Sequence, residues 1–259
     1  MMRILVLMLA LSVSTISMAD ETVVFAGSST VMPIMENMMP VFEEHGITAE
    51  IQGGGSSAGF KAAQMGMADF GMMSRNLSED EQKILDSTVI ARDWIVLIAH
   101  ADAPFDNITS EEVVEIYSSE APTLHGQDVH PIAKEGGRAT KKVFDKYFDL
   151  SGKLDSGLTI IGANGQAIAT VARDPESLAY VSYSAVEKAI EQGTPIKMLA
   201  LDGVAGTPEN AADGTYPLSR ALILAYQPKK AALMERIATI LATPEAGEVF
   251  ADSGVMPAQ

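Results

Sequence analysis

The sequence predicts an α/β fold with largely parallel strands, arranged in two lobes. Short β-branched or apolar runs alternate with segments whose apolar residues recur every three or four positions, the pattern of strands alternating with amphipathic helices. The 259 residues include no cysteine, so disulfides are excluded and hydrophobic cores must supply the stability. About 240 residues of such a pattern exceed one hydrophobic core, which favours two lobes.

The first 19 residues are expected to be a signal peptide. Arg3 is followed by an apolar run from Ile4 to Val13 and by Ser17-Met18-Ala19, a small-x-small cleavage site. The apolar run is shorter than the roughly 20 residues that span a bilayer. We therefore expect cleavage near Ala19 and a soluble mature chain in a bacterial periplasm, which suits an exported chain without disulfides.

The first hundred residues alternate predicted strands and helices. The strands are Thr22–Ala26, Ala49–Gln52, Phe70–Met73 and Trp94–Ala99. The helices are Pro33–Phe42, Ser57–Met65 and Ser78–Leu85. Within the first helix Pro33 suits the first turn, whereas Pro40 is expected to kink or end the helix, because proline lacks an N–H and clashes with the preceding turn.

The rest of the chain continues the alternation. Further strands are predicted at Val129–Lys134, Leu178–Val181, Ile196–Leu199 and Leu218–Ala225. Helices are predicted at Thr109–Tyr117, which opens with capping-box spacing, at Ala139–Phe148, from Gly165 to about Arg173, and at Lys229–Ala242 and Pro244–Ala251. The segment Gly203–Tyr216 is rich in Gly, Pro, Asn and Asp, and is expected to be an exposed connection at an edge between the lobes.

The net charge restricts the partners of the chain. A formal charge of −16 at pH 7 repels nucleic acid and anionic lipid, and it also disfavours an anionic ligand at long range. Any anion site must therefore work through short-range dipoles and hydrogen bonds.

Three junctions have the composition of an anion site at helix N-termini. They are Gly27–Thr30, Gly53–Ser57 and Gly136–Thr140, which all combine Gly with Ser or Thr; two of the three are unusually rich in Gly and Ser. A helix N-terminus offers unpaired N–H groups and a partial positive charge, Gly lets a ligand approach the backbone, and hydroxyls add donors. The alternative is ordinary N-capping and turn chemistry at each junction. None of the three matches a nucleotide P-loop.

Several segments give the chain a resemblance to a known family. The stretches "GSSTVMPIM", "QGGGSSAGFKAA", "ADFGMMSR", "ARDWIVLIAH" and "YPLSRALILAY" resemble, in order, the phosphate-binding proteins of bacterial phosphate ABC transporters. The resemblance covers nearly the whole chain after the signal peptide. It implies a type II periplasmic binding protein fold, in which each lobe is a mixed, mostly parallel sheet flanked by helices and the ligand lies in the cleft between them. Domain 1 would comprise residues 20–98 and 201–259, and domain 2 residues 99–200.

The resemblance also implies the residues of a phosphate site. Ser29 and Thr30 at the first junction and Ser56 at the second would bond phosphate oxygens. Asp69 would match the acidic residue of the family, which accepts a hydrogen bond from a phosphate hydroxyl. Such a carboxylate would reject sulfate, which brings no proton to share. Arg75 is either a charge-assisted contact to the anion or half of a surface salt bridge.

The loop of domain 2 departs from the family pattern. The family reads Arg, two variable residues and Gly-Ser-Gly-Thr, where this chain has Lys134-Glu135-Gly136-Gly137-Arg138-Ala139-Thr140. We expect Arg138 and Thr140 to bind the anion, with Ala139 in place of the second Gly and Lys134 secondary, because lysine lacks the planar bidentate grip of arginine. Arg220 is expected to be structural.

These observations lead to one main function and two alternatives. The leading expectation is a monomeric solute-binding protein that passes phosphate to the membrane permease of an ABC transporter, with no cofactor, no metal and no catalytic group. The first alternative is a sensor or binding protein retuned to another tetrahedral oxyanion. The second is a secreted phosphatase with Ser29 or Ser56 as nucleophile, although no histidine lies near either loop in sequence.

Overall fold

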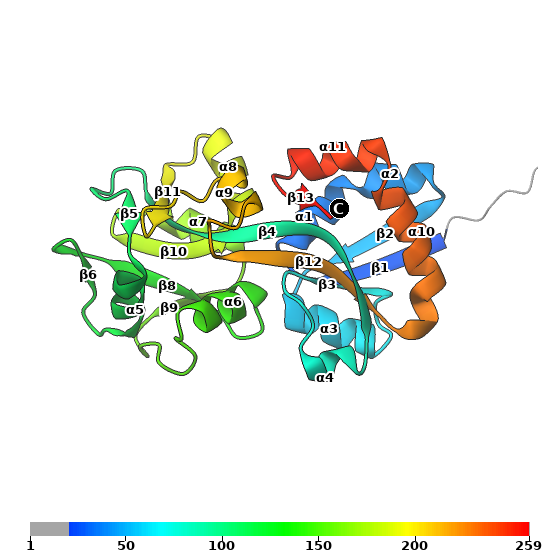
Figure 1. The fold of residues 1–259 in the computed structure, drawn as a ribbon, viewed down its shortest axis with the longest axis horizontal. Helices are drawn as coiled ribbons and strands as arrows, with labels where there is room; N and C mark the ends of the chain where they lie inside the picture. The colour runs from blue at the N-terminus through cyan, green and yellow to red at the C-terminus, as the bar shows by residue number, and fades with distance from the viewer. Residues whose placement is uncertain (1–20, 259) are drawn as a thin grey trace, which may run out of the picture.

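The computed structural model describes residues 21–258, and the predicted signal peptide lies outside the described residues. Figure 1 shows an elongated molecule with two lobes, which the long strands β4 (Asp86–His100) and β12 (Ser219–Tyr226) connect. Within the described part, no helix is long and apolar enough to cross a membrane.

Lobe 1, on the right of Figure 1, contains both ends of the described chain. Its strands follow the order β2-β1-β3-β12-β4, with β1 (Glu21–Gly27) parallel to β2 (Ile47–Gln52) and β3 (Phe70–Met73), and with β12 antiparallel to β3 and β4. A short β13 (Met256–Pro257) adds to β4. The helices of this lobe are α1 (Val31–Asn37), α2 (Met39–Glu44), α3 (Ser56–Gln64), α4 (Glu79–Gln82), η1 (Pro228–Lys230), α10 (Ala231–Leu241) and α11 (Pro244–Asp252).

Lobe 2 continues the same sheet through the second half of β4. The order there is β4-β10-β8-β9, with β10 (Ser177–Ser182) antiparallel to β4 and parallel to β8 (His130–Lys134), which is parallel to β9 (Thr159–Ile161). The other edge of β4 pairs with β11 (Ile196–Leu201), and β11 with β5 (Asn107–Ile108). The remaining elements are the hairpin of β6 (Thr123–Leu124) and β7 (Gln127–Asp128), and the helices α5 (Ser110–Ser118), α6 (Ala139–Tyr147), α7 (Asn164–Val171), α8 (Tyr183–Glu191) and α9 (Pro208–Ala212).

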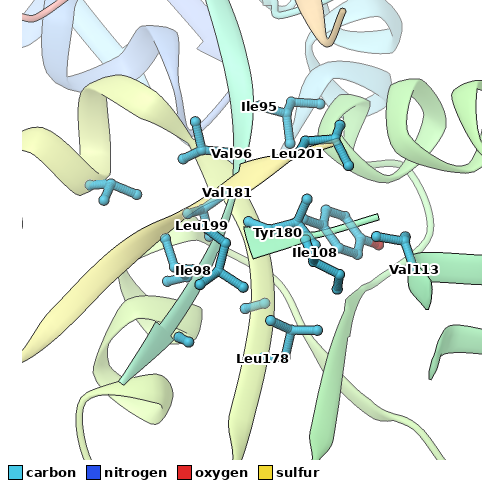
Figure 2. Packing of buried hydrophobic residues seen from close by; sticks show 14 of the residues in the cluster. Ile95, Val96, Ile98, Ile108, Val113, Leu178, Tyr180, Val181, Leu199 and Leu201 are labelled. Carbon is cyan, nitrogen blue, oxygen red and sulfur yellow. The ribbon is translucent and has the colours of Figure 1, made fainter. Parts of the chain in front are cut away.

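Each lobe has its own hydrophobic core. The main core of lobe 1 is drawn from residues 23–91 and 222–255, and the core of lobe 2 from residues 94–218. Figure 2 shows part of the second core, where Ile95, Val96 and Ile98 of β4 meet Tyr180 and Val181 of β10. The chain therefore passes between the lobes twice, in the neighbouring strands β4 and β12, whose pairing shifts register between Leu222 and Ile223.

One helical prediction needs correction, and one further helix was missed. The single helix expected at Pro33–Phe42 is two helices that meet at Met38, so the expected effect of Pro40 is confirmed: it lies in the first turn of α2 and cannot continue α1. Helix α8 was not predicted, because β10 runs into it at Ser182 without a glycine or proline between them.

The expectation of an exposed connection at Gly203–Tyr216 is wrong in part. The segment contains α9, and Ala211 and Tyr216 are buried in the core of lobe 2. The carbonyl of Gly206 also accepts a hydrogen bond of 3.0 Å from the indole N–H of Trp94. The composition of Gly203–Tyr216 is typical of a loop, but part of the segment is packed into the core of lobe 2.

Candidate anion-binding site

A small polar cavity of about 10 Å³, roughly the room that one water molecule needs, lies between the lobes. Lobe 1 contributes Ser28, Ser29, Thr30, Gly55, Ser56 and Ser74, and lobe 2 contributes Arg138, Ala139, Thr140, Gly162 and Asn164. The structure thus brings the three predicted Gly/hydroxyl junctions together and adds two that were not predicted, at Ser74 and Asn164.

The first junction is organised by the hydroxyl of Ser28. Its Oγ accepts from the backbone N–H of Thr30 (3.2 Å) and donates to the Oγ of Ser74 (3.1 Å). Ser74 directly follows β3, and its backbone N–H donates to the Oγ of Ser56 (3.2 Å) at the start of α3. The three serines therefore form a connected wall on the lobe 1 side of the cavity.

Helix α3 can reach this wall because it packs on glycine backbone. A Cβ on Gly59 would lie 2.5 Å from the carbonyl oxygen of Ala26, and one on Gly27 would lie 2.8 Å from the Cα of Gly59. Both distances are below those of ordinary carbon contacts, so α3 approaches β1 more closely than any side chain would allow. This close approach sets the position of Ser56 at the N-terminus of α3.

Arg220 connects the cavity residues of the two lobes. Its guanidinium donates to the Oγ1 of Thr140 in lobe 2 (2.9 Å) and of Thr30 in lobe 1 (3.1 Å). It also pairs with the fully buried Asp93, directly opposite on β4, at 2.6 Å. The sequence-based expectation that Arg220 is structural is therefore incomplete, because the side chain also orients two cavity hydroxyls.

Asn164 completes the environment of the Thr30 hydroxyl. Its Nδ2 donates to Thr30 Oγ1 at 3.2 Å, across the boundary between the lobes. Thr30 Oγ1 thus accepts from both Arg220 and Asn164, which occupies the two lone pairs of the oxygen. The Thr30 O–H is therefore left to act as a donor to a further partner.

Arg138 is the charged side chain among the residues that line the cavity. Its Nε donates to the carboxylate of Glu135 at 2.7 Å, and its Nη2 forms an ion pair with the same oxygen. The side chain lies across Gly55 of lobe 1, whose positive φ of 90° and missing Cβ leave room for it. Next to it, the carbonyl of Gly137 accepts from the backbone N–H of Ser57 (3.1 Å), which joins the lobes directly.

Lys134 lies behind the cavity rather than in its wall. It is 1% exposed, and its Nζ donates to the carbonyl of Ala163 (3.0 Å), just before α7. Burial lowers the pKa of the Lys134 ammonium to about 7, with further contributions from the positive charges of Arg138 and Arg220. Lys134 is therefore a buried, titratable cation in the second layer around the cavity.

Asp69 and Arg75 are not among the residues that line the cavity, which corrects the expectation for Asp69 and favours the salt-bridge alternative for Arg75. Asp69 precedes β3, where its carboxylate accepts from the N–H of Val24 (2.9 Å) and pairs with Lys230 (2.6 Å). The cavity lies beyond the opposite end of β3, at Ser74. Arg75 instead forms a two-pronged ion pair with Glu81 at 2.6 and 2.8 Å, which holds the pKa of Glu81 at about 2.

A separate cluster, outside the cavity, has the composition of a metal site. His130, Asp174 and Glu176 each offer one ligand atom, within 4.8 Å of one another. The Nδ1 of His130 is hydrogen-bonded to Asp174 at 2.8 Å, and this contact raises the pKa of the imidazole. The spacing of these residues in the sequence did not indicate the cluster, because His130 and the two acidic residues lie on segments that become neighbours only when β8 pairs with β10.

The structure has two lobes joined by two paired strands, with a small polar cavity between the lobes. This arrangement defines the class of two-lobed binding proteins with a type II fold. The chain belongs to the PBP superfamily: the family model described as a PBP superfamily domain matches residues 12–249. The predicted fold class and the family resemblance are therefore confirmed.

Individual relatives agree with this assignment. The chain is 26% identical over 230 residues to the phosphate-binding protein PstS of Staphylococcus saprophyticus, covering 79% of this chain and 69% of that protein. A shorter match, 35% identical over 99 residues, covers 34% of phosphate-binding protein PstS 2 of Streptococcus agalactiae.

A solved structure shares the fold over the full length of its chain. A putative phosphate ABC transporter substrate-binding protein with bound phosphate, from Clostridium perfringens, superposes with a TM-score of 0.85 at 24% identity, covering 92% of this chain and 100% of that one. An ABC-type phosphate transport receptor from Vibrio cholerae gives 0.74 at 21% identity, covering 90% and 99%. At these identities the likeness establishes the fold.

Proposed function

We propose that this chain is an extracytoplasmic solute-binding protein that captures inorganic phosphate between its lobes and passes it to the membrane permease of an ABC transporter. It works as a monomer in the periplasm and needs no cofactor. The observation that carries the proposal is the small cavity in which Thr30, Ser56, Ser74, Arg138 and Thr140 from both lobes converge. Relatives named for phosphate binding support the choice of anion.

The donors of the cavity suit an oxyanion in a protein of strongly negative charge. Thr30 and Thr140 accept from Arg220, so their O–H groups are directed to other partners. Arg138, which is paired with Glu135, supplies charged N–H donors, and α3 and α6 begin at the cavity wall, where they present backbone N–H groups. These contacts act at short range, and therefore do not depend on a positive surface.

The enzyme alternative lacks a general base. A phosphatase nucleophile at Ser29 or Ser56 needs a base within hydrogen-bond reach. The described residues that line the cavity include no His, Asp or Glu. This composition supports a binding role without catalysis.

Capture requires that the lobes open and close about the connecting strands. The contacts across the cavity, Ser57 with Gly137, Asn164 with Thr30 and Arg220 with Thr140, are those of a closed form. The predicted domain limits, at residues 98/99 and 200/201, stay predictions. The two cores favour a crossing nearer residues 92–94 and 218–222.

Titration calorimetry of the purified chain, stripped of bound anion, tests the proposal. We expect phosphate binding with a Kd at or below about 1 μM, which corresponds to about 8 kcal/mol. Arg138→Ala should weaken it at least tenfold, because a charge-assisted hydrogen bond is worth about 1.5–3 kcal/mol. Arg236→Ala, which removes a half-exposed ion pair with Glu21 far from the cavity, is the matched control. Absence of any phosphate heat would contradict the proposed function.

A further inference from the structure

We propose that the cavity binds tetrahedral oxyanions without recognising a proton on them, so that sulfate and the phosphate dianion are ligands of one class for this chain. The inference rests on the proposed function and names the substrate class of the same site. It departs from the expectation that Asp69 selects phosphate by accepting its hydroxyl proton.

No carboxylate is present among the described residues that line the cavity. Asp69, the expected proton acceptor, is at the other end of β3 and is paired with Lys230. The position that does follow β3 into the cavity is occupied by Ser74. A protonated ligand therefore meets a neutral hydroxyl where a charged acceptor was expected.

The two carboxylates that touch the side chains around the cavity are already engaged. Glu135 accepts from Arg138, and Asp93 accepts from both Arg220 and Ser182. Asp93 is fully buried behind Arg220. A guanidinium thus neutralises each of these carboxylates, and neither repels a dianion in the cavity as a free carboxylate would.

The hydroxyls of the cavity are arranged mainly as donors. Both lone pairs of Thr30 Oγ1 are occupied, so its O–H group is left to donate. Ser74 Oγ accepts one bond from Ser28 and keeps a lone pair, so it can donate to an oxyanion or accept from it. Ser56 Oγ accepts one bond from the N–H of Ser74 and keeps a lone pair, so it can donate to an oxyanion or accept from it.

This arrangement fits sulfate and phosphate almost equally. Sulfate needs only donors, whereas the monohydrogen form of phosphate needs one acceptor, which a neutral hydroxyl such as that of Ser56 supplies. The two ligands then differ by about one neutral hydrogen bond, which changes affinity by up to about tenfold. A carboxylate facing sulfate would instead impose like-charge repulsion, which costs on the order of 100-fold or more.

Calorimetry with the anion-free chain at pH 8, titrated separately with sodium phosphate and sodium sulfate, tests the inference. We expect sulfate to bind within about tenfold of phosphate and to displace it in competition. If phosphate binds and the affinity for sulfate is more than about 100-fold weaker, this inference is overturned and the proposed function stays intact. If neither anion binds, the proposed function itself fails.

Two variants at one position give an independent test. Ser74→Asp places a carboxylate in the cavity, and the ratio of sulfate to phosphate affinity should fall at least about 100-fold relative to the unmodified chain. Ser74→Asn, similar in size but neutral, should keep the ratio within about tenfold. If both variants change the ratio alike, the charge at this position does not determine selectivity and the inference is wrong.

Discussion

Replacing Arg220 with methionine should be among the most damaging single changes in the protein. Methionine fills much of the same volume, so the main loss is the guanidinium and not the packing. That guanidinium makes bonds of 2.9 and 2.6 Å to Asp93, a side chain that is 0% exposed. After the change, the remaining partner of Asp93 is the hydroxyl of Ser182, at 2.9 Å from each carboxylate oxygen.

The expected loss of stability follows from this burial. Removing one partner of a buried ion pair leaves an uncompensated charge and costs about 3–5 kcal/mol. With a urea m-value near 3 kcal/mol/M, the unfolding midpoint should fall by about 1–2 M. Thr30 and Thr140 also lose the donor that orients them, so phosphate affinity should fall as well.

Urea unfolding, followed by circular dichroism and by the fluorescence of Trp94, measures the loss. Arg236→Met is the control, because its ion pair with Glu21 is half-exposed and should contribute no more than about 1 kcal/mol. Its hydrogen bonds to the carbonyls of His45 and Gly46 add about 1 kcal/mol, so the loss should stay below that of the buried pair. The double change Arg220→Met with Asp93→Asn removes both charges and should recover most of the stability. A loss in Arg220→Met no larger than in the control would refute the argument that the buried pair stabilises the junction between the lobes.

Three further outcomes are expected. Gly59→Ala should weaken phosphate binding at least tenfold in calorimetry, because α3 must move away from β1 by about 1 Å and carry Ser56 with it. The control is Gly247→Ala, in open space on α11, which should leave phosphate binding unchanged. Asn164→Ala should raise the Kd about five- to tenfold, because one hydrogen bond across the lobes is lost. The pKa of Lys134 is lowered to about 7 in the folded protein, so between pH 7 and about 10 the unfolded chain binds more protons than the folded one. The free energy of unfolding should therefore rise with pH across that window. Urea midpoints measured at several pH values should show this rise, and Lys134→Met should flatten it.

The repeated junctions could be found from sequence because their signal is local. A strand, a Gly- and Ser-rich turn and a helix start follow one another within a few residues, and ligands in open α/β sheets gather beyond the carboxyl ends of strands. The same rule identifies the error made with Asp69. It precedes β3 and so lies at the amino end, whereas Ser74 follows β3 at the carboxyl end.

The remaining parts of the site depend on contacts between distant segments. Arg220 reaches Thr30 and Thr140, 190 and 80 residues away in sequence, and no local pattern reveals which hydroxyls it contacts. Asn164 did carry a signal, since it follows β9 and a glycine and opens α7. Its role nevertheless depends on an approach to Thr30 across 134 residues, which only the closed arrangement of the lobes creates.

The paired strands β4 and β12 have a mechanical consequence. A pin joint rotates freely between two rigid parts, whereas a flexure is a strip continuous with both parts that must itself bend. This protein has a flexure, because β4 runs unbroken from one lobe into the other and β12 is hydrogen-bonded along it. Any change of angle between the lobes therefore bends the paired strands β4 and β12 near their register shift. A partner that binds both lobes can thus act on the cavity by bending these strands, without contacting the residues that line it.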